Sequence, residues 1–269
     1  MKITIKSLFT ILAIIFGLTS VVHADGDLPK PGDVLSVSYP VIEEGVFGKK
    51  LLRSIPLPEG DWIVVNAWDK QSVNNAFAKQ NPIKLRDMVL VQVDSKKNIL
   101  AAIYLTTNSE SRPYRWDTEY CKDTASNFIY SNNYGGGIQA QRCTFIRTTT
   151  YLASSTPGQN SVREFYNARG FKYDPITVMV QSSEYDQNGN FLRIDYFYFP
   201  STHGLENPAS ANVTSSPWFK SNYKTDPQKI KFIEGLEVWA NQNSDLLNRY
   251  FGGSDKKVDQ IPLYKYKPN

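Results

Sequence analysis

The sequence has 269 residues, of which 21% are charged and 13% aromatic, and its formal net charge is +4. This small charge is not the concentrated basic footprint of a nucleic-acid-binding protein, and no polybasic run suited to an anionic membrane surface occurs. The length suits one large domain or two small ones, and it is ample for a buried core.

Residues 1–24 have the three parts of a secretory signal peptide. Lys2 and Lys6 supply the positive start, residues 8–18 form the apolar run, and Ala24 ends the expected cleavage site. The apolar run is shorter than the roughly 20 residues that a membrane-spanning helix needs. We therefore expect cleavage after Ala24 and a periplasmic or secreted protein; an uncleaved N-terminal anchor is the alternative.

The mature chain, residues 25–269, is expected to form a single globular domain. Loss of Lys2 and Lys6 leaves 28 basic and 26 acidic residues, so the formal net charge falls from +4 to +2. No later stretch is long and apolar enough to be an integral membrane segment. The expected partner is therefore a protein or a small molecule, and not a nucleic acid.

The first part of the mature chain has the patterns of short strands. Residues 34–41 and 50–55 are strand candidates. A proline-punctuated corner at 55–60 then leads into 61–65, which is a candidate for a buried strand.

Two later stretches share the pattern Asp-x-x-x-Asn-[Ile/Phe]-Leu-x-x-x-Tyr, at 94–104 and 186–196. Upstream, Pro-Ile pairs recur at 82–83 and 175–176, and Ser-Val pairs recur at 72–73 and 161–162. We interpret 61–106 and 143–199 as two strand–helix–strand–strand units, which predicts an α+β fold with a mainly antiparallel sheet. Chance similarity between two ordinary hairpins is the alternative.

The second hairpin allows two registers around the turn signal Asn188-Gly189. A two-residue type I′ turn places Gln187 opposite Asn190, whereas a type I turn with Gly189 in a bulge places Asp186 there. We choose the second register because it gathers one apolar face. That face comprises Ile176, Val178, Val180, Leu192, Ile194, Tyr196 and Tyr198. The opposite, wetter face carries Gln181, Ser183, Arg193 and Asp195.

Residues 107–142 form an insert between the two units. Asp117 or Thr118 is suited to cap a helix, which would continue to about Tyr130. Residues 131–137, which end in a glycine triplet, are expected to form a loop. No Lys-Ser or Lys-Thr pair follows the triplet, as a phosphate-binding loop requires.

Cys121 and Cys143 are the only cysteines. An even number of cysteines in an exported chain predicts a disulfide. Two free thiols or a metal pair are the alternatives. His203 is the one histidine of the mature chain, and these ligands are too few for a typical zinc site.

The second half of the chain predicts two helices. Ser161 opens a capping-box pattern and Gly170 suits a helix end, so a short helix is expected over 162–169. Asp226 and Pro227 begin the clearest helix, a long C-terminal one.

Whether 227–251 is one helix or two stays open, because Asn243-Ser244-Asp245 offers a second start. The tail, residues 258–269, either adds a strand or lies loose.

The motifs of common enzymes are missing. No nucleophile elbow, dinucleotide fingerprint or histidine-rich metal motif occurs, and His203 lies in a polar loop where an exposed side chain is expected. We therefore predict no catalytic, cofactor-binding or metal-binding residues. We favour a non-catalytic exported protein that binds a partner or stabilises an assembly through the insert or the wetter sheet face.

A hydrolase acting on a cell-wall or carbohydrate substrate is the alternative, because paired carboxylates can hydrolyse a sugar linkage without histidine. Glu184 is a candidate for one of the two carboxylates. Its place near the hairpin tip instead predicts a surface residue.

Overall fold

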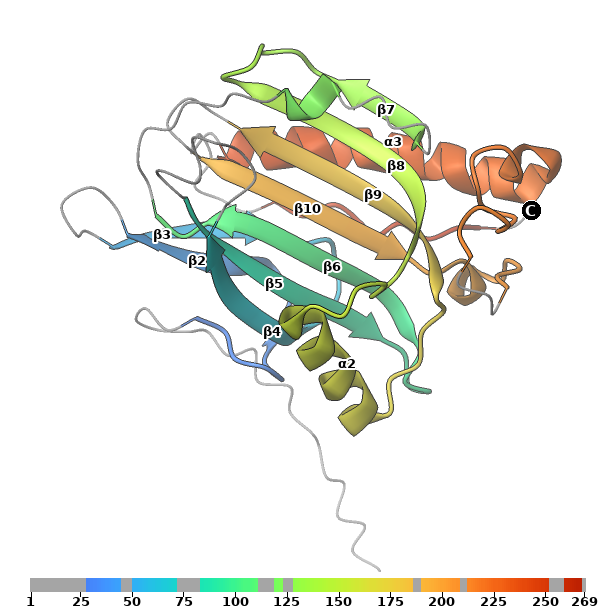
Figure 1. Cartoon of the computed structure of the whole chain (residues 1–269), viewed down its shortest axis with the longest axis horizontal. Helices are drawn as coiled ribbons and strands as arrows, with labels where there is room; N and C mark the ends of the chain where they lie inside the picture. Colours follow the sequence, from blue (N-terminus) through green and yellow to red (C-terminus); the bar gives the residue numbers. More distant parts are fainter. Residues whose placement is uncertain are drawn as a thin grey trace, which may run out of the picture.

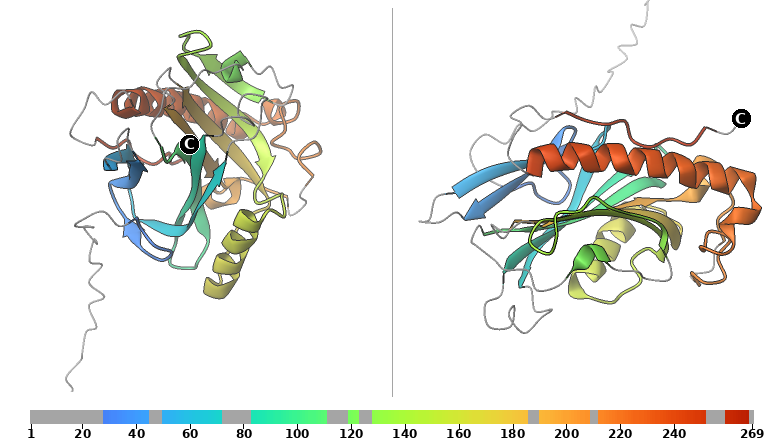
Figure 2. Two further views of the ribbon diagram at one scale, coloured as in Figure 1. Left: turned by 60° about the vertical axis from the view of Figure 1, so that its left-hand side comes forward. Right: turned by 90° about the horizontal axis from the view of Figure 1, so that it is seen from above.

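The computed structural model describes residues 28–44, 50–71, 83–110, 119–122, 128–185, 190–208, 212–251 and 259–267. These residues form a large antiparallel sheet with two α-helices, one on each face (Figures 1 and 2). The predicted α+β class, antiparallel sheet and C-terminal helix are thus confirmed. The expected signal peptide lies outside the described residues.

The large sheet has eight strands, and all neighbouring pairs are antiparallel. Their spatial order is β1 (Val34–Leu35), β4 (Trp62–Gln71), β5 (Lys84–Val93), β6 (Ile99–Asn108), β10 (Phe191–Tyr198), β9 (Ile176–Tyr185), β8 (Gln141–Thr150) and β7 (Phe128–Asn133). A second, two-stranded sheet consists of β2 (Ser38–Glu44) and β3 (Lys50–Pro56). No helix among the described residues is both long enough and apolar enough to cross a membrane.

The register of β9 and β10 is the one predicted. Tyr185 pairs with Phe191, as that register requires; the turn at 186–189 lies outside the described residues. All seven residues of the predicted apolar face are buried in the main core. On the opposite face Gln181 is partly exposed, whereas Asp195 is buried.

The main core lies between the sheet and the long helix α3 (Pro227–Phe251), on what we call the α3 face. The helix contributes Phe232, Ile233, Leu236, Trp239, Ala240 and Leu247. Asp226 caps the helix by accepting a hydrogen bond from the Gln228 amide at 2.9 Å. The helix runs without interruption through Asn243-Ser244-Asp245, so 227–251 is one helix and not two.

The tail forms no strand over residues 259–267 but packs against α3. The Trp239 indole donates to the Pro262 carbonyl at 2.8 Å, and the Tyr264 hydroxyl donates to the Phe232 carbonyl at 3.0 Å. Two short 3₁₀ helices, η3 (Pro200–His203) and η4 (Tyr223–Thr225), lie in the segment that leads to α3.

A second core lies on the other side of the sheet, beneath α2 (Pro157–Arg169), on the α2 face. It includes Val65, Val89, Val91, Tyr151, Val162 and Tyr166. Because a helix covers each face of the sheet, β5 is apolar on both sides, and its residues Met88–Val91 form a continuous apolar run.

The predicted start of α2 at 162 was wrong, although its end at Gly170 is confirmed. Thr156 caps the helix by accepting from the Gln159 amide, and Pro157 takes the first turn. Ser161 lies inside the helix, and its hydroxyl donates to the Gly158 carbonyl at 2.8 Å. Gly170 adopts the left-handed conformation with φ 67°.

The predicted helix up to Tyr130 was also wrong. The insert instead contains the 3₁₀ turn η2 (Tyr120–Lys122) and the strand β7. Pairing with β8 satisfies the backbone groups on one side of the strand, and Phe128 stacks on Phe145 with ring centroids 4.5 Å apart. These tertiary contacts override the local capping signal. Residues 111–118 and 123–127 lie outside the described residues.

The two predicted units correspond to β4–β5–β6 and β8–β9–β10, which meet where β6 pairs with β10. The helix expected after Ser72 lies outside the described residues. Tyr104 and Tyr196, which match in sequence, lie on opposite faces, because Leu100 is an extra residue in a bulge of β6. The duplication therefore stays a prediction.

Candidate functional site

Asp87 lies at the centre of a polar network on the α2 face. Although it is only 1% exposed, its carboxylate accepts hydrogen bonds from the Tyr104 hydroxyl at 2.5 Å and the Thr106 hydroxyl at 2.7 Å. Lys70 Nζ lies 2.6 Å from the same carboxylate. Three donors from β4 and β6 therefore converge on one buried carboxylate.

The network continues on β10. Asp195 lies directly opposite Tyr104, and Arg193 lies opposite Thr106. Arg193 donates two bonds to the Asp195 carboxylate, at 3.1 and 2.7 Å. This bidentate geometry fixes both side chains.

The charges of the network determine what it can do. The Asp195 carboxylate raises the pKa of Arg193, so the guanidinium stays charged. Burial, and next the Asp87 carboxylate, raise the pKa of Tyr104 well above its ordinary value. The Tyr104 hydroxyl is therefore a donor to Asp87, and the geometry disfavours a phenolate nucleophile.

Strand alternation places this network. Asp87 has the same strand phase as Val89 and Val91, whose side chains lie in the core beneath α2. Asp87 pairs with Trp68 of β4 and with Thr106 of β6, so the ionic groups lie on the same face as that core, next to it along the strands. Sequence reasoning placed Arg193 and Asp195 on the wetter face but missed Asp87. The signal in the sequence that could have indicated Asp87 is that this acidic residue is in phase with the apolar residues Val89 and Val91 of the same strand.

A pocket of about 220 Å³ adjoins the network. Tyr104 and Asp195 form part of its wall, together with Met179 and Phe197 of the sheet. The lining is completed by Val89 of β5, Arg147 and residues 149–154, and Gln159 of α2. The pocket thus combines apolar walls with a few polar groups, which is the composition of small-molecule sites.

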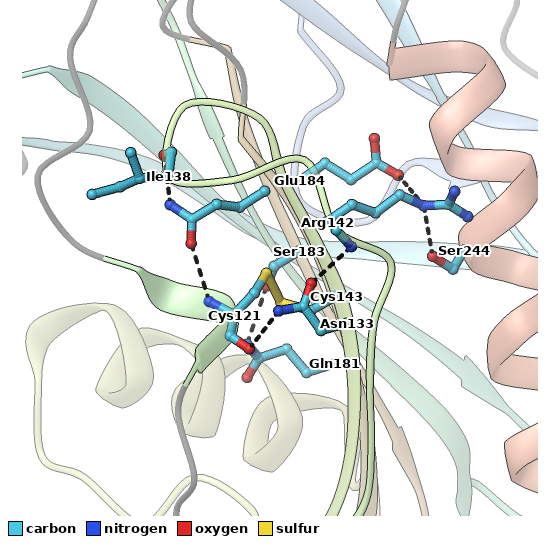
Figure 3. The surroundings of a disulfide bond; sticks show 11 residues. Cys121, Asn133, Ile138, Arg142, Cys143, Gln181, Ser183, Glu184 and Ser244 are labelled. Atoms are coloured by element: carbon cyan, nitrogen blue, oxygen red, sulfur yellow. Dashed lines mark hydrogen bonds and ion pairs between the residues drawn. A yellow bond between two sulfur atoms is a disulfide. The ribbon is translucent and has the colours of Figure 1, made fainter.

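The predicted disulfide between Cys121 and Cys143 is confirmed (Figure 3). It joins the η2 turn of the insert to the strand β8. The two Cα atoms are 5.5 Å apart. The Cys121 amide donates to Gln141 Oε1 at 3.1 Å, and Asn133 Nδ2 donates to the Cys121 carbonyl at 3.3 Å. The bridge and these bonds fix the η2 turn against β7 and β8.

The prediction that Glu184 is a surface residue was wrong. Glu184 is 4% exposed and lies on the α3 face, in phase with Val178 and Val180. Burial raises the pKa of Glu184 to about 8. Its position on the opposite side of the sheet separates it from Asp87 and Asp195, so it does not form a carboxylate pair with them.

The expectation of an exposed His203 was wrong as well. The ring lies among aromatic side chains, with its centroid 5.3 Å from that of Phe232 and 6.1 Å from that of Tyr264. The Tyr266 amide donates to its Nδ1 at 3.4 Å. Burial lowers the pKa of His203 to about 4, so the imidazole is neutral at physiological pH.

Within the described part of the chain, no three histidine, cysteine or acidic side chains lie close enough together to hold a metal ion. In comparisons with known proteins, no protein-family model, curated protein or solved structure matches the chain.

Proposed function

We propose that the chain is an exported, non-catalytic binding or assembly protein that holds a small polar ligand in the pocket beside Tyr104 and Asp195. The observation that carries the proposal is the ionic network on the α2 face, next to a pocket whose wall includes Tyr104 and Asp195. A buried ion pair is often no more stabilising than apolar residues of similar volume. Its presence next to a pocket therefore supports a role in recognition.

A thermal-shift screen tests the binding proposal. The probes are neutral sugars, amino acids and small carboxylic acids. Ala153→Trp places a large ring at an exposed residue that lines the pocket and leaves the ionic network intact. Ser155→Trp is the matched control, because residue 155 is exposed but does not line the pocket.

The expected result is that one class of probe raises the melting temperature of the wild-type and Ser155→Trp proteins but not that of Ala153→Trp. A shift that survives in Ala153→Trp would place the ligand elsewhere. No shift with any class would count against a small-molecule site.

Export is proposed from the signal-peptide pattern of residues 1–24, and a disulfide suits an oxidising compartment. The intact mass of the mature protein tests it. The expected mass is that of 25–269, and a mature cytoplasmic protein that keeps Met1 would contradict export.

A secreted hydrolase is the second candidate. Asp195 lies opposite Tyr104, and the Tyr104 hydroxyl bonds to Asp87, so two buried carboxylates flank one side chain. The test is release of reducing sugar from cell-wall polysaccharide. Activity that disappears in both Asp87→Asn and Asp195→Asn would favour the hydrolase over the binding protein.

We also propose that the sheet consists of two copies of one strand–helix–strand–strand unit. The order of the strands supports this origin. The test is the backbone chemical shifts of residues 72–82, where the first unit needs a helix; extended shifts throughout would contradict it.

A further inference from the structure

The strand β7 forms one edge of the eight-stranded sheet (Figure 1). The opposite edge is β1, which has only two residues. Among the described residues, β8 is the only strand that pairs with β7. Among the described residues, β7 is thus a six-residue sheet edge whose outer side pairs with no strand.

The hydrogen bonds of β7 show which groups point outward. The Tyr134 amide donates to the Arg142 carbonyl at 3.0 Å, and the register continues with Asn132 opposite Thr144. Because hydrogen-bonded pairs alternate along antiparallel strands, Tyr134 and Asn132 bond to β8. The backbone groups of Ser131 and Asn133 then point away from the sheet.

This edge is irregular between Phe128 and Tyr130, where its pairing with β8 shifts register, but it lacks the other features in its own residues that usually protect an edge strand. Natural edges are guarded by short length, charged side chains or proline. The six residues of β7, Phe-Ile-Tyr-Ser-Asn-Asn, include neither a charge nor a proline. The chain thus presents backbone donors and acceptors without an electrostatic barrier.

The edge is also held in place. On the α3 face, Tyr130, Asn132 and Tyr134 share the Asn241 side-chain oxygen, at 3.2, 3.1 and 2.6 Å. On the α2 face, Asn133 donates to the Cys121 carbonyl. Because the strand is already ordered, a partner strand would meet little entropic cost in pairing with it.

We propose that β7 pairs antiparallel with β7 of a second copy of this chain, which makes a symmetric dimer with one continuous sheet. Antiparallel pairing of identical strands about a two-fold axis is self-complementary. A register centred on Ser131 uses the whole strand and places the two Ser131 residues opposite each other. Because β7 contains no charged residue, no like charges face each other in this register. The dimer goes beyond the proposed ligand site and does not depend on it.

The test is the molar mass in solution of the oxidised protein, residues 25–269, by light scattering. We expect a dimer for the wild type and for the control Ser131→Ala, which keeps the backbone amide. Ser131→Lys and Ser131→Glu each place like charges directly opposite and should give monomers. An equimolar mixture of the Lys and Glu variants should form a heterodimer, which also shows that both fold.

A wild-type protein that is monomeric throughout its soluble concentration range would overturn the proposal. So would a dimer that survives both charge variants, or a mixture that stays monomeric. Slow amide exchange of Ser131 and Asn133 in a monomer would mean that another segment of this chain covers the edge, and it would overturn the proposal too.

Discussion

Glu184 on β9 lies directly opposite Arg142 on β8, with Arg142 Nε 3.7 Å from Glu184 Oε1. The same guanidinium bonds to Ser244 at 3.2 Å and to Asp245 at 2.6 Å on α3 (Figure 3 shows the Ser244 contact). Glu184 Oε1 is buried and accepts no hydrogen bond. Among the described residues the charged groups around this carboxyl are thus Arg142 and, through it, Asp245.

Glu184→Gln should stabilise the protein at neutral and alkaline pH. Burial raises the pKa of Glu184 from 4.5 to about 8, so the folded state holds a proton that the unfolded state releases. The stability that the protonated group contributes is complete below about pH 4.5 and is lost as the pH rises to about 8. The variant avoids this loss, which is on the order of 4 kcal/mol at pH 8.

Urea unfolding between pH 4 and pH 9 measures this difference. Asp245→Asn is the control: Asp245 is largely exposed, so its ion pair with Arg142 should contribute less than about 1 kcal/mol. A Glu184→Gln protein that loses stability with pH as steeply as the wild type would refute the assignment.

His203→Gln should remove a loss of stability on the acid side. Burial lowers the pKa of His203 from 6.5 to about 4, so the unfolded state binds the proton more readily. The stability is present above about pH 6.5 and is lost as the pH falls toward 4. Between these values the wild type should lose up to about 3 kcal/mol that the variant keeps.

The same urea series reports the His203 effect, whose sign is opposite to that of Glu184. Ligand binding should be unchanged in His203→Gln, because the ring lies on the α3 face among Phe232 and Tyr264 and does not line the candidate pocket. Loss of binding with unchanged stability would give His203 a functional role.

The Cys121→Ser, Cys143→Ser double variant should be less stable. The bridge closes a loop with a sequence separation of 22 residues, for which the chain-entropy model gives about 3 kcal/mol. For a chain of this size the melting temperature should fall by about 2–4 °C per kcal/mol. Wild-type protein treated with a reductant is the control and should behave like the variant. An unchanged melting temperature would mean that the bridge forms without stabilising the fold.

Tyr104→Phe should cost about 1–3 kcal/mol of stability, because it removes a donor to the buried Asp87 carboxylate. Tyr130→Phe is the matched control. Tyr130 is partly exposed, and the Asn241 oxygen to which it donates keeps the bond from Tyr134, so a loss below about 1 kcal/mol is expected. Equal losses in chemical denaturation would show that Asp87 does not depend on Tyr104.

The sequence by itself determined the elements that rest on local patterns. The β9–β10 register followed from turn chemistry and from the period-two alternation of Ile176 to Tyr198. Helix α3 followed from Asp226, Pro227 and the helical spacing of its apolar residues. The disulfide followed from the number of cysteines and the expected compartment.

Only the tertiary structure decided which residues are covered, and by what. The segment around Tyr130 is a strand because β8 offers an edge and Phe145 a stacking partner. Glu184 is buried on the α3 face, and His203 is half-buried because Phe232 of α3 and Tyr264 of the tail pack against its ring. Asp87 meets Tyr104, Thr106 and Lys70 only once β4, β5 and β6 are paired. Burial and charge pairing depend on segments that are distant in sequence, and no local pattern encodes their meeting.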